Sequence, residues 1–170
     1  MEYQIYLRPI TEEDTEKIVT WRNNPEIKKF FISQADFTTE GHLRWLHQVV
    51  EPGHACQLII CDKANDMPLG SVYIRDIDHE QHKGEYGIFI GEEAARGRGI
   101  GTQAARLAIE YGFHKLGLHR IYLRALAGND RAIRSYEKAG FKQEGYLKDD
   151  AYINGKYVDI VWMAIVNEEK

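Results

Sequence analysis

The chain makes its sharpest predicted turn at Arg96-Gly97-Arg98-Gly99-Ile100-Gly101-Thr102. A β-rich run at residues 85–90 precedes this turn, and apolar residues from Ile100 to Tyr111 then recur at helical spacing. Glycines let the backbone turn sharply and let a ligand approach the amides closely. Because the first N–H groups of a helix have no internal acceptor, they favour an anion, and two arginines add positive charge. The stretch therefore predicts an anion-binding turn, although a plain glycine-rich turn with two solvated arginines remains an alternative.

Two other phosphate-binding turns fit the chain poorly. No GxxxxGK[ST] run is present, so a P-loop is excluded. The residues from Gly99 to Ala104 satisfy the dinucleotide fingerprint GxGxxA, but that motif requires an acidic residue about 20 positions further on. The next predicted strand, at residues 121–126, ends without an acid. A dinucleotide-binding fold is therefore disfavoured.

Outward from the turn, strand and helix patterns alternate along the whole chain. Helices are predicted at residues 12–23, in a short turn from Pro25, at 39–50, from 100 to about 117, and at 130–140. Strands are predicted at residues 4–8, 57–61, 70–76, 85–90, 121–126, 145–153 and 156–166. Asn154-Gly155 is a strong hairpin signal between the last two strands. This order predicts an α/β (α+β) layer fold with a mixed sheet.

Length and composition indicate one ordinary globular domain over residues 1–170. The net charge of −4 gives no electrostatic footprint for nucleic acid or for an anionic membrane. Cys56 and Cys61 are five residues apart on one predicted strand, so they lie on opposite faces and cannot pair. Free thiols, no signal peptide after Met1 and no apolar run of about 20 residues predict a cytoplasmic protein.

Two motifs about 30 residues apart resemble the GNAT superfamily of N-acetyltransferases. Arg96-x-x-Gly99-x-Gly101 is similar to the family's acetyl-CoA loop, and residues 129–141 are similar to its N-x-x-A-I-x-x-Y-x-[KS]-x-G-F segment. The resemblance extends over residues 7–166. Residues 105–113 and 152–157 are similar to bacterial spermidine acetyltransferases, within the group that also acetylates ribosomal protein N-termini. Residues 21–26 and His42-Leu43-x-Trp45 are more similar to nucleotide-linked amino-sugar acetyltransferases.

The resemblance implies a GNAT fold: a mixed, mostly antiparallel sheet of about seven strands with helices on both faces. It implies acetyl-CoA as the co-substrate and no metal. The implied acetyl-CoA contacts are Ile88, Phe89, Ile90, Arg96, Gly97, Arg98, Gly99, Ile100, Gly101, Thr102 and Asn129. The scattered histidines show no metal-ligand spacing either.

The resemblance also implies two catalytic side chains. Tyr136 matches the tyrosine that protonates the departing thiolate, and the alternative is a tyrosine that packs a helix face. Glu85 matches the placement of a base glutamate, and the alternative is a strand-edge carboxylate facing solvent. A second base position of the family is occupied by Arg124, which leaves Glu85 or a water-mediated path to take the proton. Asp149, Asp150 and Asp159 are weaker candidates for binding a cationic acceptor.

The expected function is direct acetyl transfer, in a ternary complex, to a primary amine of a small molecule. A polyamine or an amino sugar is the expected acceptor, and a homodimer is a possible assembly. One alternative is an N-terminal acetyltransferase acting on a ribosomal or other protein. The other is a non-catalytic acyl-CoA-binding module, against which the presence of both Glu85 and Tyr136 argues, because binding CoA requires neither.

Overall fold

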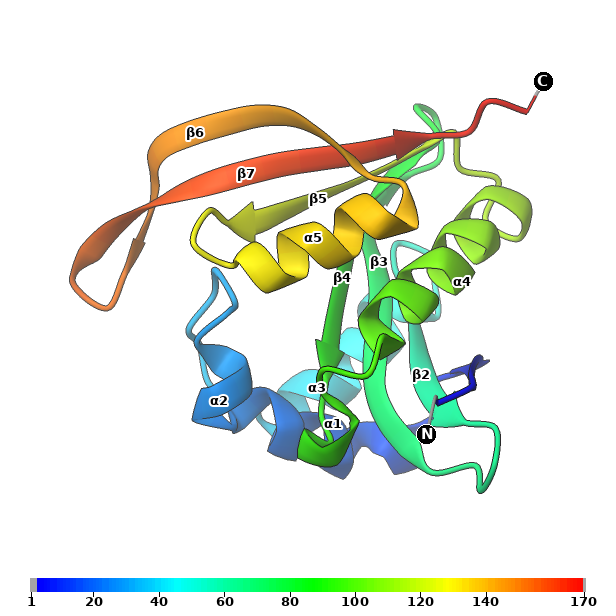
Figure 1. Cartoon of the computed structure of the whole chain (residues 1–170). Coiled ribbons are helices and arrows are strands. Elements are labelled where there is room, and N and C mark those ends of the chain that lie inside the picture. The colour runs from blue at the N-terminus through cyan, green and yellow to red at the C-terminus, as the bar shows by residue number, and fades with distance from the viewer. Residues whose placement is uncertain (1–2, 170) are drawn as a thin grey trace.

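A seven-stranded mixed sheet extends through residues 3–169, the part of the chain described by this computed structural model (Figure 1). Met1 and Glu2, on which the expected absence of a signal peptide partly rests, lie outside the described residues. The strands are β1 (Ile5–Pro9), β2 (Cys56–Asp62), β3 (Pro68–Asp78), β4 (Lys83–Ile90), β5 (Arg120–Leu126), β6 (Lys142–Ile153) and β7 (Lys156–Val166). Their order is β1-β2-β3-β4-β5-β7-β6, and only β4 and β5 pair in parallel. The predicted mixed, mostly antiparallel sheet of about seven strands is confirmed.

Helices cover both faces of this sheet, as expected (Figure 1). The helices α1 (Thr15–Asn23), α2 (Pro25–Lys28) and α3 (Thr39–Trp45) lie on one face. The other face carries α4 (Ile100–His114) and α5 (Asp130–Ala139), which also contact each other. Residues on alternate positions of the central strands therefore belong to different layers of the molecule.

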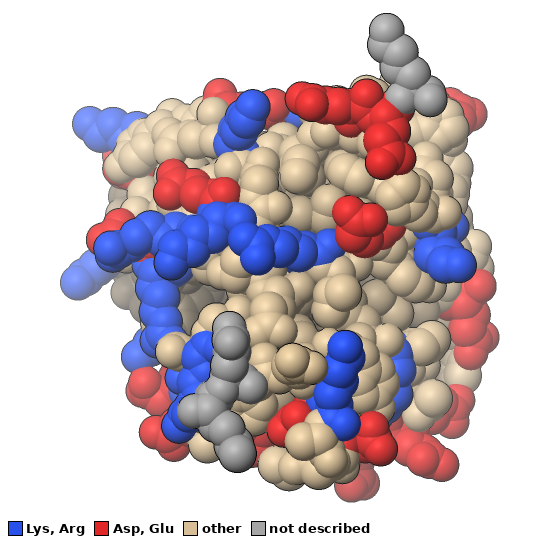
Figure 2. All heavy atoms as spheres, turned by 45° about the vertical axis from the view of Figure 1, so that its right-hand side comes forward, with Lys and Arg blue, Asp and Glu red and all other residues tan. Residues whose placement is uncertain are grey.

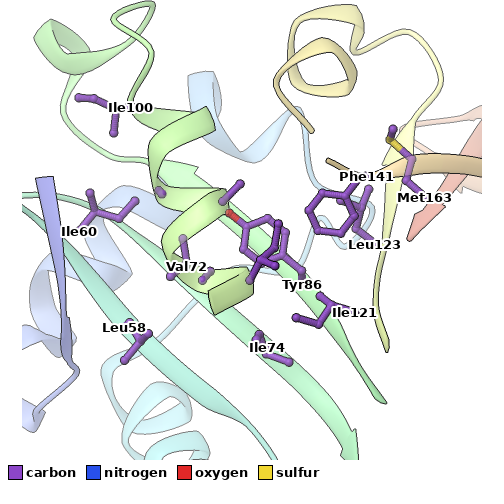
Figure 3. Packing of buried hydrophobic residues seen from close by; sticks show 14 of the residues in the cluster. Leu58, Ile60, Val72, Ile74, Tyr86, Ile100, Ile121, Leu123, Phe141 and Met163 are labelled. Atoms are coloured by element: carbon purple, nitrogen blue, oxygen red, sulfur yellow. The ribbon is translucent and has the colours of Figure 1, made fainter. Parts of the chain in front are cut away.

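The larger core cluster lies between the sheet and α4. Figure 3 shows Val72 and Ile74 of β3, Tyr86 of β4 and Ile121 of β5 packed together beside α4. A smaller cluster on the opposite face contains Trp21, Phe89 and Cys61. Cys56 packs against the larger cluster, so the two thiols lie on opposite faces, as predicted from their spacing.

Element boundaries differ from the sequence prediction at several elements, among them α4, which ends at His114 rather than near residue 117. Residues 12–14 form a 3₁₀ turn before α1, and the helix expected at 39–50 is α-helical only to Trp45 before a π-helical turn over Leu46–Val50. Apolar spacing alone cannot distinguish these windings, because neighbouring turns still present the same face. Strand β6 begins at Lys142, three residues earlier than predicted. The Asn154-Gly155 hairpin is confirmed, since both residues have positive φ.

A gap opens between the two parallel strands at the centre of the sheet. Strands β4 and β5 pair only through Lys83–Arg120, Gly84–Ile121 and Glu85–Tyr122. Beyond these pairs the two strands diverge, as Figure 1 shows. Residues 86–90 remain paired to β3 on one edge, while their other edge has no strand partner in the described chain. Backbone N–H and C=O groups along this edge are therefore available to a ligand.

Candidate active site

The glycine turn places a helix N-terminus beside the open edge of β4. Gly97 and Gly99 have φ of 74° and 76°, the left-handed region that favours glycine, and Gly99 is the N-cap of α4. No heavy atom lies within 4 Å of a Cβ built on Gly99, so the space above it is open. The first hydrogen bond across this cap runs from the Gln103 N–H to the Gly99 carbonyl (3.2 Å). The three preceding N–H groups are left for an anionic ligand.

Both arginines of the turn fold back onto nearby carbonyls. The Arg96 side chain donates to the carbonyls of Ile90 (3.3 Å) and Gly91 (3.4 Å), which fixes the turn to the end of β4. Arg98 donates to the Ala94 carbonyl (3.0 Å) and is exposed. Their positive charges therefore stay at the turn, as the sequence predicted.

Helix α5 adds cationic groups that the sequence analysis missed. The Arg131 Nη2 atom lies 2.8 Å from the position a Cβ would take on Gly97, so this guanidinium reaches the turn. Arg134 and Lys138 of the same helix are exposed. Figure 2 shows a band of Lys and Arg side chains crossing this side of the molecule. In the sequence, the only sign of these cationic groups was their position on the helix that follows Asn129. Only the packing of α5 on α4 brings Arg131 to the turn.

Asn129 and Tyr136 lie at the two ends of the inner face of α5. The Asn129 side-chain oxygen accepts from the Ala132 N–H (3.4 Å), so Asn129 is the N-cap of α5. The Tyr136 ring packs edge-on against Tyr86 (6.2 Å between ring centroids) and Phe141 (6.0 Å). Burial raises the pKa of Tyr136 above its usual range, and its hydroxyl makes no hydrogen bond within residues 3–169. A neutral phenol with a free O–H is a suitable hydrogen-bond donor to a thiolate.

The three residues at the end of β4 do not all face the turn. Ile88 and Ile90 pack with the core under α4, whereas the Phe89 side chain packs with Trp21 and Phe31 on the opposite face. A ligand in the gap can meet all three through their backbone, but only Ile88 and Ile90 through side chains on the α4 side.

Glu85 is the last residue of β4 that pairs with β5, so it lies where the gap begins. Its side chain is only 8% exposed, and the alternative of a solvent-facing carboxylate is therefore wrong. Arg124 of β5 donates to both carboxylate oxygens (3.0 and 3.4 Å), and Arg75 of β3 donates to one of them (3.3 Å). These contacts hold the carboxylate in place and leave little room for a further donor.

A cavity of ≈ 320 Å³ lies on the face covered by α1 and α3. Tyr73 and Arg75 of β3 and Phe89 of β4 form its sheet side, and Arg22 of α1 and Trp45 of α3 form its helix side. Arg75 connects this cavity to Glu85. The size is that of a small-molecule site.

His42 lies at this cavity and has a structural role. Its Nδ1 atom lies 3.0 Å from the Thr15 hydroxyl and its Nε2 atom 3.3 Å from the Gln57 side-chain oxygen. Gln57 in turn binds Trp45 (3.2 Å) and the Ser71 hydroxyl (3.1 Å). Burial lowers the pKa of His42, which keeps the ring neutral. Since both ring nitrogens have partners, the ring is held in place and neither a base nor a hydrolase triad forms here.

Several weaker candidates lie elsewhere or do not converge. Asp159 accepts from the Tyr146 hydroxyl and the Asp149 N–H on the exposed β6–β7 hairpin, so the expectation that these acids bind an acceptor has no support at the cavity. Within residues 3–169 no three His, Cys, Asp or Glu side chains gather as a metal site would require. No helix in this part of the chain has the length and apolarity to cross a membrane.

The gap thus joins a glycine turn with free helix N–H groups on one face to a small cavity on the other, an arrangement that suits an acyltransferase with two substrates. A family model described as an acetyltransferase (GNAT) domain matches residues 4–142. The spermidine N(1)-acetyltransferase of Escherichia coli (strain K12) is 30% identical over 169 residues, covering 98% of this chain and 88% of that relative. The chain belongs to the GNAT acetyltransferase family and is an acetyl-CoA-dependent N-acetyltransferase.

Two further comparisons agree with this assignment. The crystal structure of a spermidine N-acetyltransferase from Vibrio cholerae in complex with CoA and spermine has a TM-score of 0.89 at 26% identity, covering 96% of this chain and 95% of that chain. A putative ribosomal N-acetyltransferase, YdaF of Bacillus subtilis, is 34% identical over 100 residues, covering 59% of this chain and 54% of that relative. The predicted family and GNAT fold are confirmed.

Proposed function

We propose that the protein acetylates a primary amine of a small molecule by direct transfer in a ternary complex. The cavity is the observation that supports this proposal most directly. Its volume of ≈ 320 Å³ suits a small acceptor, and the cavity reaches the gap from the face opposite the glycine turn. Acetyl-CoA supplies the acetyl group as an activated thioester. The amine enters from the cavity and the thioester lies in the gap, so the two reactants meet without a covalent enzyme intermediate.

Two acceptor classes have support. A polyamine is supported by the relatives named spermidine acetyltransferases in Escherichia coli and Vibrio cholerae. An amino sugar is supported because Arg22, His42 and Trp45, from the segments that resemble amino-sugar acetyltransferases, line the cavity. Both classes present a primary amine that must lose a proton before it attacks.

The acetyl-CoA site that we propose follows the open edge of β4 and the N-terminus of α4. Backbone groups of residues 88–90 pair with the extended arm of the cofactor, and the amides of the turn bind its pyrophosphate. Asn129 offers its amide N–H₂ to the arm, since only its oxygen is used in capping. The turn residues in this site are Arg96, Gly97, Arg98, Gly99, Ile100, Gly101 and Thr102.

Tyr136 donates a hydrogen bond to the departing thiolate in this proposal. Its position on the α5 side, where the turn lies, supports the role, and so does its free hydroxyl. Because its pKa is raised, the phenol remains protonated across the working pH range and stabilises the thiolate without giving up its proton completely.

Glu85 takes the amine proton through a water molecule in this proposal. Two arginines already donate to its carboxylate, and one of them, Arg75, lies between this carboxylate and the cavity. A relay therefore fits the geometry better than direct contact.

The proposed function is tested by CoA release from acetyl-CoA with purified protein and a panel of amines. The panel contains spermidine, glucosamine, glucosamine 6-phosphate, diamines and short peptides with free N-termini. We expect release with small amines and little with peptides. Release with peptides alone would favour the N-terminal acetyltransferase. Tight CoA binding without release for any amine would favour the non-catalytic module.

The role of Glu85 is tested by Glu85→Gln with Arg124→Gln as its control. Both variants break the same ion pair, but only the first removes a base. We expect kcat/KM for the amine to fall on the order of 10²-fold in Glu85→Gln alone, with loss of the acidic limb of its pH profile. Equal losses in both variants would show that the ion pair, and not the base, matters.

We further propose that residues 1–170 act as one cytoplasmic acetyltransferase domain that forms a homodimer. Free Cys56 and Cys61 support a reducing compartment. The β6–β7 hairpin exposes Tyr146, Tyr152 and Tyr157, at 58–68% of their surface, which supports a contact between copies. Light scattering of the purified protein measures the mass, and a monomer at micromolar concentration would contradict the dimer.

A further inference from the structure

The cavity that receives the acceptor holds more positive than negative charge. Arg22 and Arg75 both line it, and both have a buried Nε atom without a hydrogen-bond partner. The acid at its rim is Asp36, which is 81% exposed and paired with Lys28. His42 is neutral. A ligand inside this cavity therefore meets two guanidinium groups.

Arg22 is held in the cavity by aromatic rings and has no acidic partner. Its guanidinium lies 3.6 Å from the ring centroid of Phe31 and 4.2 Å from that of Phe37. Such stacking covers the flat faces of the group and leaves its in-plane N–H donors unused. Within residues 3–169 Arg22 forms no ion pair with a carboxylate, its Nε atom has no hydrogen-bond partner, and the polar group that faces it in the cavity is the Tyr73 hydroxyl. Burial lowers the pKa of Arg22 and the neighbouring Arg75 acts in the same direction, while Tyr73 opposes them only in part.

The contacts of Arg75 do not neutralise the excess positive charge of the cavity. Its nearest buried carboxylate is Glu85, which Arg124 binds more closely. Arg75 and Arg124 therefore share the buried Glu85, and Arg75 also lies 3.9 Å from the exposed Asp76, while Arg22 has no carboxylate partner. The buried Nε–H groups of Arg22 and Arg75 lack an acceptor, which costs stability unless a ligand supplies one.

We propose that the acceptor carries an anionic group, a carboxylate or a phosphate, which Arg22 and Arg75 bind while the amine points toward the gap. This inference rests on the proposed function and names the acceptor's chemical class. A planar guanidinium matches the paired oxygens of either anion. A polycation such as spermidine has no such group and meets like charges in the cavity, so it is a poorer ligand than an anionic amine of similar size.

Matched amines test this inference by calorimetry, with no turnover required. Glucosamine 6-phosphate against glucosamine tests a phosphate, and 2,4-diaminobutyrate against 1,3-diaminopropane tests a carboxylate. We expect the anionic member of at least one pair to bind at least tenfold more tightly than its partner and than spermidine. The pair that shows the larger difference identifies the anion. Equal or absent binding in both pairs, or tighter binding of spermidine, would overturn the inference.

Two variants test whether Arg22 is responsible for the preference for the anionic amine. Arg22→Gln removes the charge and keeps a polar side chain, and Arg44→Gln makes the same change on the exposed surface of α3, outside the cavity. We expect Arg22→Gln to reduce the preference for the anionic probe at least tenfold and Arg44→Gln to leave it unchanged. A preference that survives Arg22→Gln in a folded protein would overturn the inference. Failure of the proposed function appears separately, as absence of CoA release from the wild-type protein.

Discussion

The buried Tyr86 of β4 and the half-buried Tyr136 of α5 meet edge-on, and they differ in what their hydroxyls can reach. The Tyr86 hydroxyl is enclosed in the core without a hydrogen-bond partner, whereas Tyr136 lies on the helix that borders the gap. Burial raises the pKa of both side chains, so both remain neutral phenols. Only the position of the hydroxyl separates a packing role from a catalytic one, which makes the two residues a matched pair for mutation.

We expect Tyr136→Phe to lower kcat on the order of 10²-fold with little change in KM for acetyl-CoA. The lost hydrogen bond acts mainly in the transition state, where the thiolate forms. Tyr86→Phe removes an unsatisfied hydroxyl and should leave kcat unchanged. Steady-state kinetics of both variants measures these changes in kcat. Full turnover in Tyr136→Phe would show that Tyr136 has a packing role only.

A second matched pair tests the glycine turn. Gly99 and Gly117 have φ of 76° and 68°, and a Cβ on either meets no heavy atom within 4 Å. Alanine at each position therefore carries a similar backbone cost, about 1 kcal/mol. We expect only Gly99→Ala to weaken acetyl-CoA binding, by at least about tenfold or 1.4 kcal/mol. Calorimetry and thermal unfolding of both variants separate an effect on binding from an effect on stability. Unchanged CoA affinity in Gly99→Ala would show that the turn does not bind acetyl-CoA.

At the scale of elements, Asp14 fixes the start of α1 to the edge strand β1. Its carboxylate accepts from Arg8 at both oxygens (2.7 and 2.8 Å) and from the Thr11 N–H (2.9 Å). Burial alone would raise the pKa of Asp14, but the hydrogen bonds from Arg8 and Thr11 outweigh it and lower the pKa. Because the folded state favours the ionised form, this contribution is present above the unfolded pKa and is lost as pH falls through the folded one.

We expect Asp14→Asn to lower the free energy of unfolding by about 2 kcal/mol at pH 7. The difference from wild type should shrink below about pH 3.9, the ordinary pKa of an aspartate. Glu40→Gln removes an exposed ion pair with Arg44 and should cost less than about 1 kcal/mol. Urea unfolding at several pH values measures these differences. A constant difference down to pH 2 would contradict the electrostatic explanation.

At the scale of the whole molecule, the gap between β4 and β5 separates two substrate faces. The turn and α5 lie on one side, and the cavity with Arg22 lies on the other. Neither cysteine lines the cavity: Cys61 is fully buried, and burial raises the pKa of Cys56 to about 11, which disfavours the thiolate that an acyl carrier needs. This arrangement supports the direct transfer that we propose, with both substrates bound together.

We expect initial rates measured against both substrates to give intersecting double-reciprocal lines. A ternary complex produces this pattern, whereas a covalent acetyl-enzyme produces parallel lines. Mass spectrometry of the protein with acetyl-CoA alone should show no added acetyl group at a cysteine. Parallel lines together with such an adduct would contradict direct transfer.

The local elements were predictable because their signals lie close together in the chain. The glycine turn, the α4 stripe and the Asn154-Gly155 hairpin each depend on residues within one or two turns of one another. Boundaries were less predictable, as the π-helical turn after Trp45 shows, because apolar spacing does not specify the winding.

The sequence by itself determined the family, the seven-stranded fold and the turn at Arg96–Thr102, since these follow from motifs and periodicity. Only the tertiary structure decided that Glu85 is buried between two arginines, that Phe89 faces the cavity and that Arg22 and Arg75 meet there. Arg22 and Arg75 are more than fifty positions apart, on a helix and a strand whose facing sides no local pattern specifies. The packing of α1 against the sheet brings these charges together, and we infer that this contact sets which amine the cavity favours.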